Sequence, residues 1–110
     1  MSEEMRPIKV VLCGSMRFEA EMQEANRAES VAGRIVLAPA CNLKEPHPLW
    51  ATEADRERVK TALDRLHLDK IRDADEVLVI NPGGYVGEST RKEIEFAQSI
   101  GRPIRSLEAL

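Results

Sequence analysis

The chain is poor in cysteine and has no long apolar run, and each shortage excludes a class of protein. Its two cysteines, Cys13 and Cys41, are too few for a disulfide framework or a four-ligand zinc site. No apolar stretch approaches the roughly 20 residues that cross a bilayer. Residues 1–7 are polar and acidic and contain no apolar segment, so we expect no signal peptide. These absences predict a cytoplasmic protein without a membrane partner.

The chain has no excess of basic charge. The 16 Lys and Arg residues are outnumbered by 19 Asp and Glu residues, which gives a formal net charge of −3. Because no basic block exists to meet a phosphate backbone, we expect no nucleic-acid duplex as a partner. With 43% hydrophobic and 32% charged residues in 110, the composition is that of one ordinary globular domain spanning residues 1–110.

The residues that are present predict alternating strands and helices. Their order, with short connections, favours a single-domain α/β fold of the flavodoxin-like or Rossmann-like type, with helices on both faces of a parallel sheet in the order 2-1-3-4. Residues 41–50, with three residues Pro-His-Pro at 46–48, are expected to be irregular. Strands are predicted at 8–13, 34–40, 76–80 and 103–107, and helices at 15–30, 52–72 and 89–100. The inner stripe of the middle helix is predicted to comprise Val59, Ala62, Leu63, Leu66, Lys70 and Ile71.

Two loops stand where such a sheet binds ligands. In open parallel sheets the ligand lies beyond the carboxyl ends of the strands, where the strand order reverses. Here the reversal falls between the first and third strands, so we expect the loops that follow them to lie side by side. The candidate binding residues are Cys13, Gly14, Ser15, Met16 and Arg17 in the first loop and Asn81, Gly83, Gly84, Tyr85, Gly87, Glu88, Ser89 and Thr90 in the second.

Neither loop carries a standard nucleotide fingerprint. The first has one glycine where a dinucleotide site needs G-x-G-x-x-G. The second has Glu88 before its two hydroxyl residues, where a Walker A motif requires Lys. The glycines and hydroxyl residues of these two loops are instead suited to bind a single phosphate or the hydroxyls of a sugar. We expect no cofactor and no metal, because no His, Asp or Glu is spaced to form a convincing metal site.

Glu93 is the candidate for chemistry. It shares a helical stripe with Ala97 and Ile100, which places it on the sheet-facing side near the crevice. The helix dipole is expected to keep its carboxylate ionised, as a nucleophile or base requires. The alternative is structural, because Thr90 to Glu93 also forms a capping box. Tyr85 either covers a sugar or base or packs on the neighbouring loop.

Three segments together carry a family resemblance. They are L-C-G-S-M-R at 12–17, K-I-R-D-A-D at 70–75, and the stretch 87–97 with E-I-E-F-A at its end. On these motifs the chain resembles the nucleoside 2-deoxyribosyltransferase-like superfamily, which includes 2′-deoxynucleoside 5′-phosphate N-hydrolases. The resemblance covers most of the chain and implies the flavodoxin-like fold already expected.

The resemblance also implies an activity: cleavage of the N-glycosidic bond of a nucleoside or nucleotide, with Glu93 as the nucleophile. Gly14, Ser15, Ser89 and Thr90 would then hold a 5′-phosphate or the sugar. His67 stands where family enzymes commonly have a second acid, an aspartate, and from the helical pattern alone it is a core or boundary residue. The family commonly completes its site with a neighbouring subunit, so a homo-oligomer is expected.

Two other functions stay open at this point. His67 in place of the aspartate favours a non-catalytic nucleotide-binding or sensor module. The run from Pro82 to Glu93 also looks like the P-G-G-x-G-T-x-x-E motif of phosphoribohydrolases, with extra residues between the glycines and the threonine. Those enzymes cleave an N-glycosidic bond too.

Overall fold

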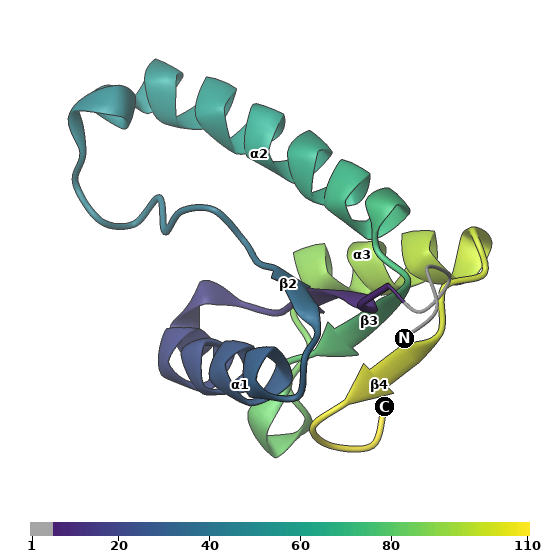
Figure 1. The fold of residues 1–110 in the computed structure, drawn as a ribbon. Coiled ribbons are helices and arrows are strands. Elements are labelled where there is room, and N and C mark those ends of the chain that lie inside the picture. The colour runs from purple at the N-terminus through teal and green to yellow at the C-terminus, as the bar shows by residue number, and fades with distance from the viewer. Residues whose placement is uncertain (1–5) are drawn as a thin grey trace.

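A computed structural model describes residues 6–110, and the alternation of strands and helices is as expected (Figure 1). The absence of a signal peptide was inferred largely from residues 1–5, which lie outside the described residues. The strands are β1 (Lys9–Cys13), β2 (Ile35–Leu37), β3 (Glu76–Val79) and β4 (Ile104–Ser106). The α-helices are α1 (Glu19–Val31), α2 (Glu53–Asp73) and α3 (Glu88–Ser99), and the short 3-10 helices are η1 (Met16–Phe18), η2 (Pro48–Trp50) and η3 (Pro82–Gly84).

The four strands form one sheet in the order β2-β1-β3-β4, and every neighbouring pair is parallel. This confirms the predicted topology. The two central strands are buried on both faces, from Val10 to Cys13 and from Val77 to Val79, because helices cover the sheet on each side. The carboxyl ends of β1 and β3 lie together, since Cys13 pairs with Val79.

The core consists of two apolar layers, one on each face of the sheet. On one face α1 packs Met22 and Ala25 against side chains that include Leu12 and Leu78. On the other face α2 and α3 pack against the alternate side chains of the same strands, and Figure 1 shows these two helices together opposite α1. The helix residues of this second layer are Ile71, Ile94 and Ala97.

The predicted inner stripe of α2 is wrong at Ala62 and Leu66. Ala62 is exposed and Leu66 is 45% exposed, whereas His67 and Ile71, near the carboxyl end, are buried. A helix of 21 residues is about 32 Å long, much longer than strands of 3 to 5 residues. Its first half therefore extends beyond the sheet, beside the long segment that follows β2 (Figure 1).

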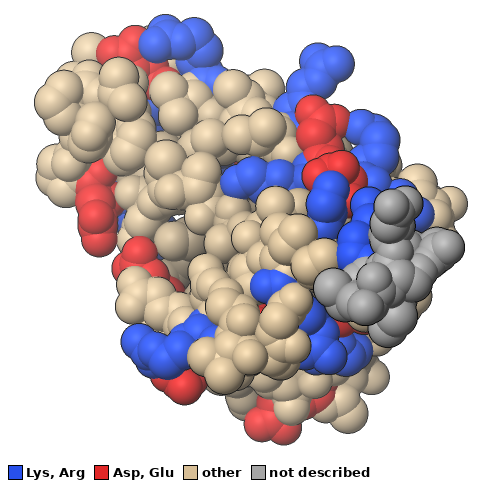
Figure 2. All heavy atoms as spheres, viewed as in Figure 1, with Lys and Arg blue, Asp and Glu red and all other residues tan. Residues whose placement is uncertain are grey.

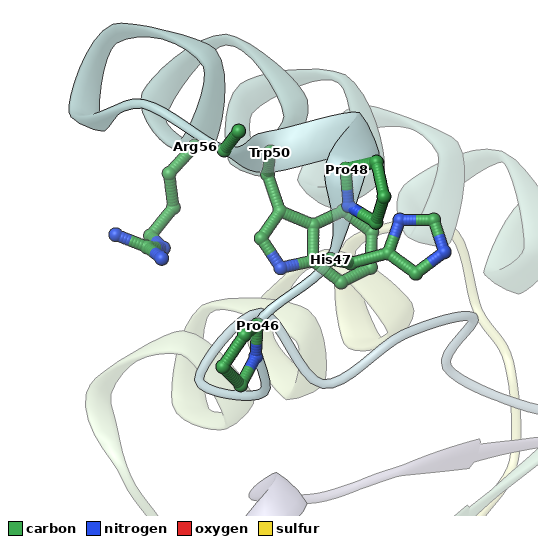
Figure 3. A pocket seen from close by; sticks show the side chains of 6 residues that line it. Pro46, His47, Pro48, Trp50 and Arg56 are labelled. Atoms are coloured by element: carbon green, nitrogen blue, oxygen red, sulfur yellow. The ribbon is translucent and has the colours of Figure 1, made fainter.

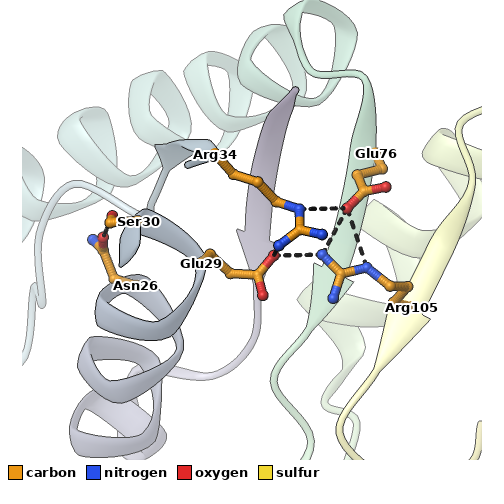
Figure 4. A network of polar contacts seen from close by, with 6 residues as sticks. All are labelled: Asn26, Glu29, Ser30, Arg34, Glu76 and Arg105. Atoms are coloured by element: carbon orange, nitrogen blue, oxygen red, sulfur yellow. Dashed lines mark hydrogen bonds and ion pairs between the residues drawn. The ribbon is translucent and has the colours of Figure 1, made fainter. Parts of the chain in front are cut away.

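Two arginines and two glutamates join the sheet to α1 at the end remote from the carboxyl ends of the strands (Figure 4). Arg105 on β4 donates to Glu76 at 2.6 Å and to Glu29 on α1, and Arg34 approaches the same two carboxylates. Glu29 is buried, so its charge depends on these partners. The network explains how a buried glutamate is tolerated on the inner face of α1.

Arg105→Ala should lower the free energy of unfolding by about 1–2 kcal/mol, because it deprives a buried carboxylate of its closest cation. Urea unfolding at pH 7 measures this. Arg27→Ala is the matched control, since Arg27 pairs with Glu24 on the exposed side of α1 and should cost less than about 0.5 kcal/mol. Equal losses in the two variants would show that the network contributes no more than a surface pair.

Candidate functional site

The loops after β1 and β3 lie side by side, as the topology predicts. The amide of Ile80 donates to the Cys13 carbonyl at 2.8 Å. Further out, the ring of Phe18 meets the ring of Tyr85 edge-on with centroids 5.7 Å apart, and the Arg17 guanidinium lies 4.3 Å above the Tyr85 ring. Tyr85 therefore packs on the neighbouring loop, and with 42% of its surface exposed it also faces solvent.

These loops form one wall of a cavity of about 840 Å³, a size typical of small-molecule sites. The opposite wall comes from α2 and from the segment that follows β2. Most of the residues selected from the sequence line this cavity: Gly14, Ser15, Met16, Arg17, His67, Tyr85, Gly87, Glu88, Ser89, Thr90 and Glu93.

Four of the selected residues do not line the cavity. Asn81 is fully buried, and its side chain exchanges two hydrogen bonds with the backbone of Glu108. Gly83 and Gly84 belong to η3, where φ angles of 66° and 81° require glycine in an exposed turn. Cys13 is fully buried behind the cavity wall. Asn81 and the two glycines therefore shape the second loop without facing the cavity.

Sequence reasoning missed the basic residues of the opposite wall. Five cations line the cavity, against three acids, Asp64, Glu88 and Glu93. The one available signal was a lysine on the predicted inner stripe of α2, where an apolar residue is the rule. Figure 2 shows that elsewhere on this face basic and acidic residues are interspersed. The cavity is thus suited to a small anion although the chain is acidic. The five cations are Arg17, Lys44, Arg56, Lys60 and Lys70.

Three chemically versatile side chains meet at the inner end of this cavity. The Cys13 sulfur lies 3.4 Å from Nε2 of His67, and the same nitrogen lies 3.9 Å from a Glu93 carboxylate oxygen. They come from β1, α2 and α3 respectively. The sequence separates them by 54 and 26 residues, counted as 67 − 13 and 93 − 67, so only the packing of both helices on the sheet brings them together.

Burial governs the charge of Glu93. It raises the pKa of this carboxyl from 4.5 to about 7, and the charge on Asp64 adds to the rise, while the Cys13 thiol opposes it. The expectation that the helix dipole keeps Glu93 ionised is therefore not met, because burial outweighs it. No Lys or Arg within residues 6–110 pairs with Glu93. The group is half protonated near neutral pH.

The two side chains that meet Glu93 at the inner end of the cavity, His67 and Cys13, are uncharged at neutral pH. Burial, reinforced by the charge on Lys70, lowers the pKa of His67 to about 4. Burial also raises the pKa of the Cys13 thiol well above its ordinary value. The 3.9 Å approach of His67 and Glu93 is accordingly a contact between a neutral imidazole and a carboxyl, and no ion pair forms.

The capping-box interpretation of Glu93 is wrong. The helix begins earlier than expected, with Gly87 as its N-cap, so Thr90 is already inside α3 and is buried. In a capping box on this helix the acid would stand at position 90, so Glu93 lies one turn too far along the helix to reach back to the Gly87 amide. Its side chain, 18% exposed, turns toward the cavity instead, as the stripe with Ala97 predicted.

Gly14 allows the two loops to approach each other. A Cβ on this residue would lie 2.8 Å from the backbone oxygen of Ile80, closer than packing permits. Ser15, next to it, caps η1 by accepting a hydrogen bond from the Arg17 amide. The loop after β1 therefore needs a glycine at position 14 in order to pack against Ile80, which follows β3.

Gly14→Ala should destabilise the fold by about 1–3 kcal/mol through overpacking, with a lower melting temperature as the readout. Gly87→Ser is the control, because a Cβ at Gly87 would meet nothing closer than 3.4 Å and serine is a favourable N-cap. An unchanged melting temperature in Gly14→Ala would mean that the two loops can separate without cost.

A second, smaller hollow of about 380 Å³ lies at the far end of the molecule, around η2 (Figure 3). The aromatic residues of this hollow already have partners within the chain. The rings of His47 and Trp50 stack with centroids 4.6 Å apart, and the indole donates a hydrogen bond to the Glu45 carbonyl. His47 also caps η2 by accepting a hydrogen bond from the Leu49 amide at its Nδ1. No acid lines this hollow, so the larger cavity is the candidate site.

No protein-family model matches the chain, and no curated protein matches it in sequence. Its structure does match a solved one, that of a 2-deoxyribosyltransferase from the psychrotolerant bacterium Bacillus psychrosaccharolyticus, a biocatalyst for nucleoside synthesis. The TM-score is 0.67 over 93% of this chain and 76% of the other. The chain shares the fold of that enzyme. At 18% identity the similarity establishes the fold alone.

Within residues 6–110 every helix is too short or too polar to cross a bilayer. The flavodoxin-like architecture expected from the sequence is confirmed: the strand order is the predicted 2-1-3-4, and helices cover both faces of the sheet. The expected homo-oligomer and the cytoplasmic location stay predictions.

Proposed function

We propose that the protein cleaves, or transfers the sugar across, the N-glycosidic bond of a nucleoside or nucleotide, with Glu93 as the nucleophile. The observation that carries this proposal is the position of Glu93. Its carboxyl lies in the wall of the large cavity, where the two loops meet, and no Lys or Arg of the described chain neutralises it. The fold shared with a 2-deoxyribosyltransferase supports the same reaction class.

In this mechanism the ionised Glu93 attacks the anomeric carbon of the sugar. A carbon–oxygen bond forms, the bond to the base nitrogen breaks, and the base leaves with the bonding electrons and takes up a proton. Water then attacks the glycosyl ester and releases the sugar, or a second base takes its place and completes a transfer. This is the two-step scheme of retaining glycosidases.

The wall of the cavity offers the groups that such a substrate needs. Ser15 and Ser89 stand on the two loops, and hydroxyls of this kind bind sugars or phosphates. The exposed ring of Tyr85 can stack on a base. The excess of cations over acids around the cavity favours a substrate with a phosphate over a neutral nucleoside.

The test is to incubate the protein with a panel of nucleosides and nucleoside 5′-monophosphates and to separate the products by chromatography. We expect free base to appear, and at a higher kcat/KM for the monophosphates. A second base added to the reaction distinguishes transfer from hydrolysis, because transfer yields a new nucleoside. Absence of free base from every substrate would refute the proposal.

A second function is favoured by His67, a neutral side chain where the resembling enzymes commonly have an acid. Without a second acid the cavity would bind a nucleotide without cleaving it. In that case calorimetry would detect binding of a nucleoside monophosphate, while no base is released over a long incubation. A protein that binds no nucleotide at all contradicts both functions.

A further inference from the structure

Cys13, His67 and Glu93 also have the properties of a metal site, although no spacing in the sequence predicted one. The atoms that each would offer, a sulfur, a ring nitrogen and a carboxylate oxygen, all lie within 4.8 Å of one another. Thiolate, imidazole and carboxylate are the three kinds of protein ligand that zinc takes. Three elements of the fold, β1, α2 and α3, each supply one of them.

We propose that Cys13, His67 and Glu93 together bind one Zn²⁺ ion, with the fourth ligand position open to the cavity. Three protein ligands and one open position are the usual pattern of a reactive zinc site, whereas structural sites carry four protein ligands. The proposal concerns binding of the ion by this chain and does not depend on the proposed glycosidase function.

The distances fit with little movement. Bonds of about 2.0 Å to nitrogen and oxygen and about 2.3 Å to sulfur in a tetrahedron place the ligand atoms roughly 3.3 to 3.6 Å apart. The sulfur and nitrogen are already 3.4 Å apart, and the nitrogen and carboxylate oxygen are 3.9 Å apart. The sulfur and the carboxylate oxygen lie within 4.8 Å of each other, so the flexible Glu93 side chain has to move by roughly an ångström to complete the tetrahedron. Cys13 and His67 are fixed by the sheet and by buried packing.

The other buried polar side chains of the described chain do not share this arrangement. Glu29 pairs with two arginines, and Asn81 is bonded to the backbone of Glu108. Glu93 has no comparable cationic or backbone partner within residues 6–110. A cation between the three groups would give a buried carboxyl, an imidazole and a thiol one common partner.

The ion would have a way in and a place for a fourth ligand. His67 and Glu93 both line the large cavity, which is open to solvent. Asp64, a further acid of α2 that lines the cavity, is exposed and pairs with Lys60 at 2.8 Å. Water or an incoming small molecule would occupy the fourth ligand position.

The experiment uses the whole chain, treated with a chelator, desalted and then mixed with ZnCl₂ alone. After a second desalting step, elemental analysis should find about one zinc per chain, and competition with a chromophoric chelator gives the affinity. His67→Ala and Cys13→Ser should each weaken binding by at least about tenfold, since each removes one of three ligands. Replacing Zn²⁺ with Co²⁺ should give a sulfur-to-cobalt absorption band in the parent chain that Cys13→Ser abolishes.

Matched controls use the same residue types outside the cluster. Cys41→Ser and His47→Ala should bind zinc as the parent chain does, since neither residue belongs to the cluster. Melting curves with and without ZnCl₂ distinguish a lost ligand from a lost fold: a folded variant still melts cooperatively but is no longer stabilised by zinc. If zinc is not retained, or if His67→Ala and Cys13→Ser bind it as tightly as the parent chain, the proposal is overturned.

If the chain also releases base from nucleotides, the two uses of Glu93 exclude each other. Zinc on its carboxylate would block attack on the sugar, so ZnCl₂ should inhibit base release and a chelator should restore it. Zinc binding in a chain that releases no base would uphold the metal site and refute the glycosidase. Base release in a chain that binds no zinc would uphold the glycosidase and refute the metal site.

Discussion

Glu93→Gln should reduce base release from nucleoside monophosphates by at least about 10³-fold in kcat, because an amide cannot form the glycosyl ester on which the two-step scheme depends. Chromatography of the free base measures this with the chelator-treated protein. Substrate binding should change much less, since glutamine keeps the shape of the side chain and the cations on the opposite cavity wall are untouched. Calorimetric titration with a monophosphate checks that point.

Glu95→Gln is the matched control for this result. It is the same change, two residues along α3, on the exposed side of the helix. Parent-like activity in Glu95→Gln with loss in Glu93→Gln assigns the effect to the cavity side of α3. Undiminished activity in Glu93→Gln would contradict a glutamate nucleophile at this position, whatever reaction the protein carries out.

The rate of base release should rise about 50- to 100-fold between pH 5 and pH 8 and level off above that. Burial raises the pKa of Glu93 to about 7, and only the ionised carboxylate attacks, so about 1% of the protein is competent at pH 5 and about 90% at pH 8. Initial rates at saturating substrate across this range measure the profile.

The profile should show a single ionisation in this window. His67, whose pKa is lowered to about 4, stays neutral from pH 5 to pH 8, and the Cys13 thiol stays protonated. A rate that is flat from pH 5 to pH 8 would contradict the assignment of the nucleophile to a buried carboxyl. A bell-shaped profile would mean that a second group, not identified in this site, transfers a proton.

The same raised pKa affects stability in the opposite direction. A carboxyl whose pKa rises from 4.5 to about 7 on folding stabilises the fold below pH 4.5, and this contribution is lost as the pH rises through 7. A change in pKa of this size corresponds to roughly 3 kcal/mol. Glu93→Gln should therefore be more stable than the parent chain at pH 8, with a gap that narrows toward pH 5, as urea unfolding at the two pH values can show.

The fold was largely predictable from the sequence. Continuous apolar strands such as residues 77–80, separated by helical patterns, leave few arrangements other than a parallel sheet covered on both faces. The error on α2 shows the limit of such patterns. Apolar periodicity in Ala62 and Leu66 predicts a buried face, but burial also requires something to pack against, and the sheet ends before the helix does.

The candidate site, like the fold, was predicted in some of its features and not in others. Strand order by itself predicted that the loops at Gly14 and Tyr85 lie together, because parallel strands end at one edge of the sheet. The stripe on α3 predicted that Glu93 faces inward. The sequence did not reveal that Asn81 is a structural residue, because its partner is a backbone group near the end of the chain.

The sequence by itself determined the topology, the edge of the sheet that bears the cavity and the turn of α3 that carries the acid, because these follow from local periodicity and from the rules of parallel sheets. Only the tertiary structure decided what surrounds that acid. Packing of α2 and α3 on one face brings His67 and Cys13 to Glu93, buries the histidine and the cysteine, and leaves the Glu93 side chain 18% exposed. Desolvation depends on contacts across the whole chain, and no local pattern in the residues records it.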